Sequence, residues 1–339
     1  ATLRRPAAGA ARIAGHPLPR GADAARARLG FVAHEPRLYP DLTARENVRL
    51  SAWLQGLPDP DRAAAAALDS LDLTVHADRL VATLSHGTAR RVAIARALAH
   101  EPVLLLLDEP YDGLDAASAA ALDAALARCV DAGGAVVMAS HDRERAARHA
   151  DRVVLLDRGV VAWSGAPRAE AGGFAAACAA IERGQALVAA ATAGDFEPFD
   201  PAEAAPEEPV GPRRARPGAL ATVAALAAKD LRIERRGLVA LPPMVLFGIV
   251  TAAVISRAIP AGGPDAASLA AATLWVAALL GATLGFGRSV ALEVEGGALS
   301  GLLASPIDRG ALFLGKWLAA WLLASLMGGV AAVATALFL

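Results

Sequence analysis

Apolar positions follow one pattern in the first half of this chain and a different one in its last third. From about residue 11 to residue 161, short runs of leucine and β-branched residues alternate with Ala-rich amphipathic stretches. This alternation predicts an α/β domain with a largely parallel sheet, since strands buried on both faces are apolar throughout. The best strand candidates are residues 29–32, 103–107, 135–139 and 153–156.

Three uncharged runs occupy the last third, at residues 238–256, 266–287 and 317–339. Each is close to the roughly 20 residues that a helix needs to cross a bilayer. A buried helix of a soluble domain is the alternative for any single run, but three runs close together favour membrane spans. We therefore expect an all-α transmembrane helical domain embedded in a lipid membrane.

Positive charges flank these runs unevenly. They gather before the first run and between the second and third runs: Lys229, Arg232, Arg235, Arg236, Arg288, Arg309 and Lys316. The loop after the first run carries Arg257 alone. Because cytoplasmic flanks are enriched in lysine and arginine, the start of the first run and residues 288–316 are expected in the cytoplasm.

Residues 191–217 separate the two patterns and are rich in proline, alanine and acidic residues. Such a segment buries too little apolar surface to order itself, which predicts a disordered, Pro-stiffened linker. The expected domains are therefore residues 1–190, the linker 191–217 and the helical domain 218–339.

Charge and cysteine usage narrow the function classes. The formal net charge is −1 and arginines alternate with acidic residues, so we expect no nucleic-acid partner. Cys129 and Cys178 lack C-x-x-C spacing, which indicates reduced thiols rather than a redox pair.

Most candidate catalytic and binding residues follow the ends of predicted strands. The run 103–107 leads into Asp108-Glu109, an arrangement that places one carboxylate on Mg²⁺ and the next on an attacking water. Ser85 stands where it caps a helix whose amides face phosphate. Past Asp115, the strand 135–139 ends in Ser140-His141, where a histidine can contact a γ-phosphate.

Residues 84–141 resemble an ABC ATPase, because they carry that family's signature loop, Walker B strand, D-loop and switch histidine in the family's order along the chain. The resemblance implies a P-loop-type α/β domain with ATP and Mg²⁺ as cofactors. It implies that Asp108 holds Mg²⁺ through water, Glu109 is the general base and His141 senses the γ-phosphate.

The same resemblance implies a second copy of such a domain. Ser85 and Gly87 would reach the ATP bound by that second copy, and Asp115 would lie at the dimer seam. The signature loop departs from the family's Leu-Ser-Gly-Gly-Gln, because His86 and Thr88 replace a glycine and the glutamine. The contact with the opposite nucleotide is therefore less firmly assigned.

The family's Mg²⁺-sensing glutamine, which also touches the membrane domain, has no direct counterpart after the strand 29–32. The loop there reads Ala33-His34-Glu35-Pro36. Either His34 or Glu35 takes that role, or the loop lies on the surface without contacting metal.

The phosphate-binding loop G-x-x-x-x-G-K-[ST] is absent from residues 1–339, whose first lysine is Lys229. Because ABC ATPases carry this loop just upstream of sequence like residues 1–6, we expect an additional N-terminal segment. Residues 1–339 alone are expected not to hydrolyse ATP, since no backbone cradle or lysine holds the phosphates.

The last third resembles the CcmB-type membrane component of the haem exporter used in cytochrome c maturation, itself similar to type-2 ABC exporters. The matching motifs lie at residues 229–231, 291–299, 305–306 and 314–316, and residues 33–47 resemble the CcmA-type ATP-binding component of that exporter. The resemblance implies a fused half-transporter in the cytoplasmic membrane, multi-pass with a cytoplasmic ATPase. It would act as a homodimer or with a second ABC half, alongside other cytochrome c maturation proteins.

Residues 288–316 mix acids, glycines and apolar positions at partly helical spacing, which predicts a short interfacial helix that contacts the ATPase. Glu293 and Glu295 are expected to pair there with arginines of the ATPase domain. Among haem axial ligands, residues 218–339 offer only Met244 and Met327. A type-2 exporter of a drug, lipid or polysaccharide, or a regulatory ABC protein without ATPase activity, therefore remains an alternative.

Overall fold

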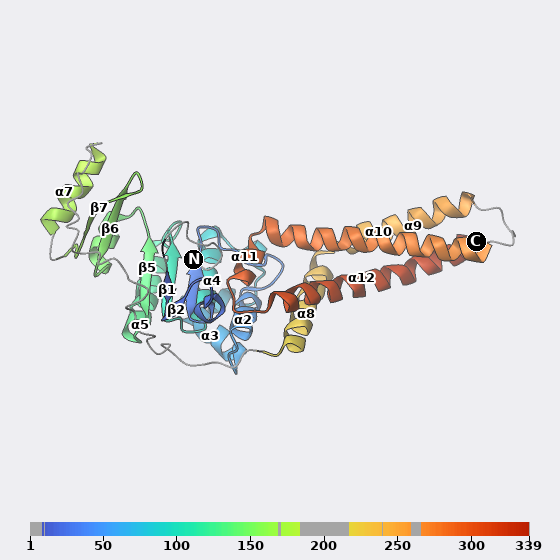
Figure 1. The fold of residues 1–339 in the computed structure, drawn as a ribbon, viewed down its shortest axis with the longest axis horizontal. Helices are drawn as coiled ribbons and strands as arrows, with labels where there is room; N and C mark the ends of the chain where they lie inside the picture. Colours follow the sequence, from blue (N-terminus) through green and yellow to red (C-terminus); the bar gives the residue numbers. More distant parts are fainter. Residues whose placement is uncertain are drawn as a thin grey trace.

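The structure is a computed structural model that describes residues 9, 11–168, 171–183, 217–238, 240–258 and 266–338. An α/β half lies at one end, and long helices extend from it as a rod (Figure 1). The predicted linker 191–217 lies outside the described residues, except for Pro217.

Three strands form the central sheet of the α/β half, in the order β3–β4–β5, and all pairs are parallel. They are β3 (Leu29–Val32), β4 (Leu104–Asp108) and β5 (Ala135–Ala139). Three of the predicted strands and their parallel pairing are thereby confirmed, with β4 shifted by one residue.

The fourth predicted strand does not join this sheet, so the prediction of one largely parallel sheet is wrong at that point. Instead β6 (Val153–Asp157) pairs antiparallel with β7 (Val160–Gly165). The turn between them holds Arg158 at φ 49° and Gly159 at φ 82°. Two successive positive φ values suit the tight hairpin turn that matches strand twist, which explains the antiparallel return.

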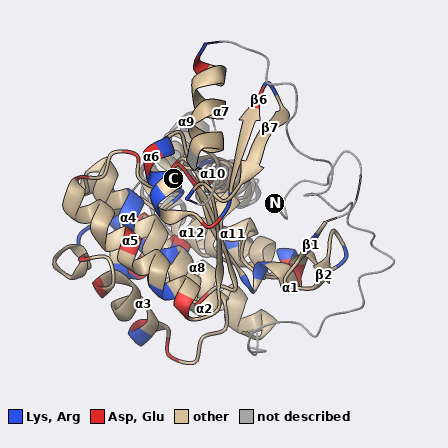
Figure 2. Cartoon of the chain, turned by 90° about the vertical axis from the view of Figure 1, so that its left-hand side faces the viewer, with Lys and Arg blue, Asp and Glu red and all other residues tan. Residues whose placement is uncertain are grey.

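Helices cover the sheet, and many begin at a side-chain cap. Thr43, Asp59, Ser85 and Asp115 each accept a backbone N–H of the first turn. The helices are α1 (Ala22–Arg26), α2 (Ala44–Leu54), α3 (Pro60–Asp69), α4 (His86–Leu98), α5 (Ala116–Asp131), α6 (Arg143–His149) and α7 (Ala171–Glu182). Short elements are β1 (Arg12–Ile13), β2 (His16–Pro17), η1 (Thr74–His76) and η2 (Val81–Thr83). Figure 2 shows acidic and basic residues interspersed over these helices.

Five helices form the second half: α8 (Ala219–Gly237), α9 (Leu241–Ala258), α10 (Ala266–Glu295), α11 (Ala298–Leu303) and α12 (Arg309–Phe338). Helices α9, α10 and α12 contain most of the three uncharged runs, and α10 and α12 extend beyond them into charged sequence. The predicted short helix within residues 288–316 corresponds to α11, which is shorter than that segment because α10 continues to Glu295 and α12 begins at Arg309. Only α11 stands alone between them.

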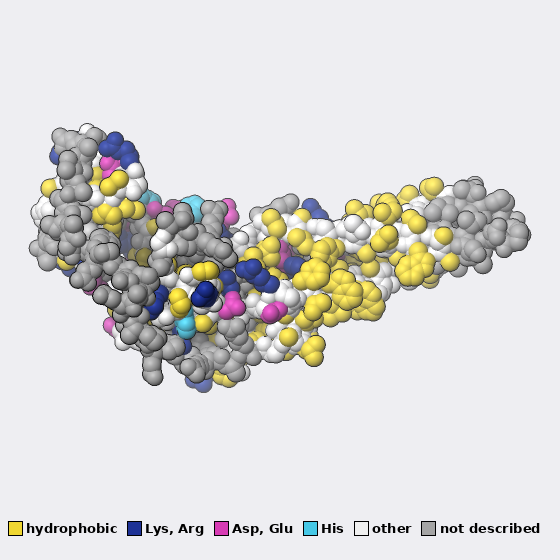
Figure 3. All heavy atoms as spheres, in the orientation of Figure 1, with side chains coloured by type: hydrophobic (Ala, Val, Ile, Leu, Met, Phe, Trp, Pro, Cys, Tyr) yellow, Lys and Arg dark blue, Asp and Glu magenta, His cyan; other side chains and the backbone are white. Residues whose placement is uncertain are grey.

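Hydrophobic side chains cover much of the rod (Figure 3). Within the described residues, one stretch is long and apolar enough to cross a membrane, Arg309–Val330 of α12. Leu241–Thr251 of α9 is a shorter apolar stretch. The three-span arrangement stays a prediction.

Both methionines of the rod fill space between helices. A Cβ on Gly285 would overlap the Sδ of Met244, and one on Gly281 would overlap the Cε of Met327. Both methionine side chains are buried. They pack α9 and α12 against α10.

We predict that Gly30→Ala destabilises the α/β half. The new Cβ would lie 2.8 Å from the carbonyl oxygen of Ala97 and 2.6 Å from Leu105 Cδ1, which forces backbone and core to shift. Overpacking of this kind costs roughly 1–3 kcal/mol, so thermal unfolding of the purified chain should begin several degrees lower. Gly172→Ala is the matched control, because Gly172 is helical and nothing lies within 4 Å of its Cβ position. Equal melting of the two variants would contradict the packing account.

Candidate functional site

Two of the predicted catalytic residues meet where β4 and β5 end. Because these strands are parallel neighbours, their carboxyl ends lie at one edge of the sheet. His141 Nδ1 lies 2.9 Å from Glu109 Oε2. This hydrogen bond and the nearby carboxylate charge raise the pKa of His141 above its ordinary value. Asp108, the last residue of β4, is half-buried beside them.

Glu109 has an unusual backbone conformation. Its φ is 47°, in the left-handed region that side-chain-bearing residues seldom occupy. Its N–H donates to the carbonyl of Ala139 at 2.9 Å. Such conformations persist only where neighbours fix them, and they concentrate at functional sites.

Arg90 of α4 supplies much of that fixation, although the motifs of the sequence did not single it out. The residue is 0% exposed. Its guanidinium donates to the carbonyls of His34, Asp108 and Glu109, with 2.6 Å to that of Asp108. Burial lowers the pKa of Arg90, yet an arginine side chain remains charged. Arg90 precedes the buried residues Ala93 and Ile94 by three and four positions, so the helical period places it on the same buried face of α4. This spacing is a signal by which the sequence could have identified Arg90 as buried.

The signature loop lies at the start of α4. The Thr88 N–H donates to Ser85 Oγ at 3.2 Å, which confirms the predicted cap. Gly87 packs against the following loop so closely that a Cβ there would lie 2.5 Å from the Gly113 carbonyl oxygen. Contact between these two loops therefore requires glycine at position 87.

Asp115 begins α5. Its Oδ1 accepts the Ser118 N–H at 2.8 Å, and this hydrogen bond lowers the pKa of Asp115. Its side chain is exposed, as is that of Ser85.

The loop after β3 leads from this site to the helical half. The His34 and Glu35 side chains are exposed. Arg96 of α4 donates to the carbonyls of Pro36, at 3.2 Å, and Arg37, at 2.5 Å. A Cβ on Gly301 of α11 would lie 3.3 Å from the Arg37 carbonyl oxygen. The loop thus contacts α11, and assignment of the metal-sensing role to His34, to Glu35 or to neither residue stays a prediction.

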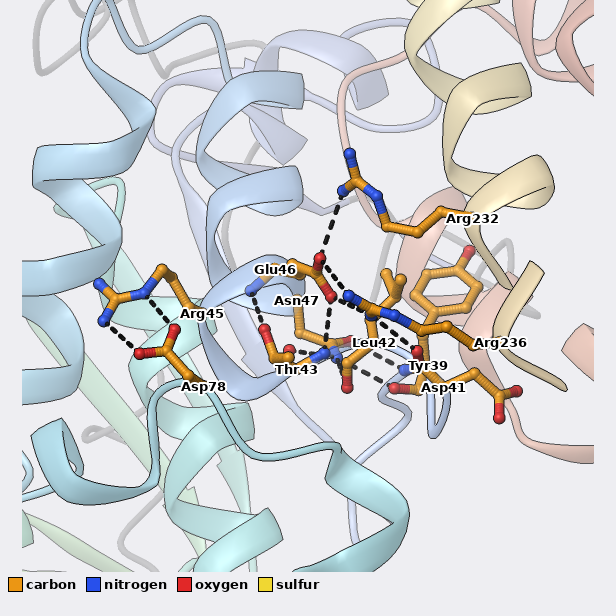
Figure 4. Close-up of polar contacts among 10 residues, drawn as sticks. All are labelled: Tyr39, Asp41, Leu42, Thr43, Arg45, Glu46, Asn47, Asp78, Arg232 and Arg236. Carbon is orange, nitrogen blue, oxygen red and sulfur yellow. Dashed lines mark hydrogen bonds and ion pairs between the residues drawn. The ribbon is translucent and has the colours of Figure 1, made fainter. Parts of the chain in front are cut away.

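Glu46 of α2 anchors the helical half (Figure 4). Arg236 of α8 donates to both Glu46 oxygens, at 2.6 and 3.0 Å, and Arg232 forms an ion pair at 3.5 Å. Glu46 also accepts the Thr43 N–H at 2.9 Å, which completes the capping box of α2. Partial burial would raise the pKa of Glu46, but hydrogen bonds from Arg236 and Thr43 outweigh it and hold that pKa low.

The predicted pairing of Glu293 with ATPase-side arginines is wrong. Glu293 is buried and contacts Lys229 and Lys316, both within the helical half. The side chain of Glu295 lies outside the described residues. The cause is the length of α10, which carries Glu293 between α8 and α12. The ion pairs that join the two halves have the opposite arrangement to the predicted one: the acid, Glu46, is on α2 of the α/β half, and the arginines are on α8 of the helical half.

An apolar cluster joins the two halves beside these ion pairs. Its members come from the loop after β3, from α2, α8 and α11, from the loop between α11 and α12, and from the start of α12: Tyr39, Leu42, Leu54, Leu226, Ala298, Leu302, Ile307 and Leu312. Burial of such side chains is the main favourable term in association. The halves therefore share one continuous core at this junction.

Comparison with known families divides the chain in the same way. The model for the ATP-binding region, described as "ABC transporter", matches residues 1–112. The model described as "CcmB protein" matches residues 221–339.

Curated relatives match the α/β half. The chain is 39% identical over 165 residues to the lipoprotein-releasing system ATP-binding protein LolD 2 of Caulobacter vibrioides, covering 46% of this chain and 72% of that protein. It is 35% identical over 169 residues to the Nod factor export ATP-binding protein I of Paraburkholderia xenovorans, covering 49% of this chain and 56% of the relative. The chain spans about half the length of the first such relatives. A solved "Structure of ATP binding subunit of ABC transporter" shares 28% identity over 53% of this chain and 76% of that chain, with a TM-score of 0.48.

The α/β half thus aligns with ATP-binding proteins of transporters, and the helical half matches the CcmB protein model. This chain belongs to the ABC transporter family, as an ATP-binding domain fused to a CcmB-type domain.

Proposed function

We propose that this chain forms the ATPase and part of the permease of an exporter in the cytoplasmic membrane, and that its cargo is haem for cytochrome c maturation. The observation that carries the proposal is the fusion of an ABC transporter region to a CcmB region in one chain. The apolar cluster and the Glu46–Arg236 pair support mechanical linkage of the two halves. The domains would be residues 1–190 and 218–339, with the ATPase in the cytoplasm.

The residues at the sheet edge fit ATP and Mg²⁺. Asp108 would hold Mg²⁺ through water, because carboxylate oxygens suit this hard cation. Bound Mg²⁺ would neutralise charge that develops on the phosphates. Glu109 would accept a proton from the attacking water, and His141, hydrogen-bonded to it in this structure, would move to the γ-phosphate.

A second ATP-binding domain completes the proposed site. Ser85 and Gly87 would contact the nucleotide of that domain, and Asp115 would lie at the seam. The exposure of Ser85 and Asp115 supports this arrangement. Fusion of ATPase and permease in one chain favours a homodimer, although another ABC half would serve the same geometry. Other cytochrome c maturation proteins would receive the cargo.

One observation favours a different cargo. Residues 218–339 contain no histidine, cysteine or tyrosine, and Met244 and Met327 are buried against glycines. An exporter of another lipid-like molecule is therefore the second candidate. Proteoliposomes that carry the complete transporter separate the two: ATP-dependent movement of haem supports the first, and movement of a fluorescent lipid without haem supports the second.

We predict that Glu109→Gln abolishes turnover while ATP binding persists. The neutral amide cannot accept the proton, so turnover should fall by at least about 10²-fold. The measurement uses protein in which a G-x-x-x-x-G-K-[ST] loop precedes residue 1, with phosphate release and nucleotide binding followed separately. Glu144→Gln on α6 is the control and should retain turnover. Undiminished phosphate release by Glu109→Gln would assign the base elsewhere.

A double-mutant cycle tests the anchor between α2 and α8. Glu46→Gln and Arg236→Gln each remove one charge, and glutamine at position 46 preserves the capping box. Each single variant should lower cargo-stimulated ATP turnover about fivefold, as loss of roughly 1 kcal/mol of a charged hydrogen bond implies. The double variant should be no worse than either single one.

The Arg45–Asp78 pair provides the matched control for this cycle. It also starts on α2, but both partners belong to the α/β half (Figure 4). Arg45→Gln and Asp78→Asn should leave stimulation unchanged. Strictly additive losses in the Glu46–Arg236 cycle would show that this pair does not act as a unit.

A further inference from the structure

Four charged side chains are buried together where α8, α10 and α12 meet. They are Lys229, Asp230, Glu293 and Lys316, each between 4% and 9% exposed, and we call them the charge quartet. Lys229 Nζ forms an ion pair with Glu293 and lies 2.6 Å from Asp230 Oδ1. Lys316 Nζ lies 2.8 Å from Glu293 and 3.5 Å from Asp230. Each lysine therefore contacts both acids, and the four formal charges cancel.

Stability alone does not account for such a quartet. Taking charges out of water is costly, and apolar residues of similar volume often join helices equally well. Ionic contacts in a dry interior depend steeply on distance and on which residues face each other. A closed set contributed by three helices therefore favours one relative position of those helices.

Close packing of α8 against α12 makes the ion pairs of the quartet more sensitive to the relative position of these helices. A Cβ on Gly315, the neighbour of Lys316, would lie 2.8 Å from Leu226 Cβ and 3.1 Å from the Val223 carbonyl oxygen. Helices α8 and α12 thus nearly touch beside the quartet. A small sliding movement of α8 would alter the ion pairs that it makes with α10 and α12.

The ATP-binding half reaches the quartet through Tyr39. Lys229 Nζ lies 4.3 Å from the centre of the Tyr39 ring, within the range of a cation–π contact. Asn47 of α2 fixes Tyr39 from the other side: its Oδ1 accepts the Tyr39 N–H at 2.8 Å, and its Nδ2 donates to the Tyr39 carbonyl at 3.0 Å. A cavity beside the quartet, lined by Tyr39, Asp230, Glu293, Gly285 and Leu323 among others, leaves room for rearrangement.

We propose that the charge quartet links the position of the loop after β3 to the register of α8, α10 and α12, with Lys229 as the positioning residue. This inference rests on the proposed function, in which nucleotide binding drives the helical half. Movement of Tyr39 changes the surroundings of Lys229, and Lys229 transmits that change to Asp230 on its own helix and to Glu293 on α10.

The test measures helix movement directly and does not require a known cargo. Spin labels at Leu220→Cys on α8 and Leu326→Cys on α12, both exposed, report their separation in lipid nanodiscs. Cys129 and Cys178 are first replaced by serine. The protein carries an added N-terminal segment with a G-x-x-x-x-G-K-[ST] loop together with Glu109→Gln, and the distance distribution is recorded with and without ATP and Mg²⁺.

The quartet predicts which variants lose the ATP-dependent shift. Lys229→Met/Glu293→Gln keeps the quartet neutral, so it should fold with an unchanged melting temperature yet lose the shift. Tyr39→Leu, which removes the ring but keeps apolar volume, should lose it too, whereas Tyr39→Phe should retain it. Arg45→Met/Asp78→Asn is the control with an intact shift.

The outcomes separate this inference from the proposed function. A wild-type shift in the folded Lys229→Met/Glu293→Gln variant overturns the role of the quartet, as does an equal shift in Tyr39→Leu and Tyr39→Phe. If the unmodified quartet shows no shift although Glu109-containing protein hydrolyses ATP, the quartet proposal is wrong and the proposed function stands. If the Glu109-containing protein hydrolyses no ATP, while the ATP-dependent change in spin-label distance appears in the Glu109→Gln protein and depends on Lys229, the quartet proposal is supported and the proposed function fails.

Discussion

A buried guanidinium needs acceptors on every side, and this requirement organises the candidate site. Arg90 is fully enclosed, and its two terminal nitrogens donate to the carbonyls of His34, Asp108 and Glu109. Leaving such polar groups unpaired in the interior would cost several kcal/mol in total, about 1–3 kcal/mol for each. Helix α4, the loop after β3 and the end of β4 are therefore held as one unit. The left-handed backbone of Glu109 is maintained at the centre of that unit.

From this unit, the route to the helical half is short. The loop whose His34 carbonyl binds Arg90 continues directly to Tyr39 and Asp41, which contact α8. The next turn carries Thr43 and Glu46, whose capping box also receives Arg236. The chain between the end of β3 and the first turn of α2 thus connects the sheet edge to α8. It does so through a cation–π contact, a hydrogen bond and an ion pair. No long-range pathway through the core is required.

Much of this fold was predictable from short stretches of sequence, because residues close together along the chain determine where strands form. Apolar runs indicated β3, β4 and β5, and parallel pairing then placed His141 beside Glu109. The β6–β7 hairpin was missed because Arg158 gives no turn signal, although it adopts a positive φ there. Arg90 was overlooked because an arginine in an amphipathic stretch is usually solvated. One partner of Glu293, Lys229, lies 64 residues away on α8, and such a pairing has no local signature.

Two ionic contacts of α8, Arg236 with Glu46 and Lys229 with Glu293, differ in how strongly water and salt weaken them. Glu46 and Arg236 remain partly open to water, so dissolved salt screens their attraction, and either partner can separate without leaving a charge in a dry interior. Lys229 and Glu293 are enclosed, so they are screened little, and separating them exposes each to the cost of an unpaired buried charge. Helix α8 therefore has a releasable contact at its end near α2 and a firmly held one closer to its middle. A force applied by the α/β half near Glu46 would therefore tilt α8 about the enclosed contact, where α10 and α12 meet it.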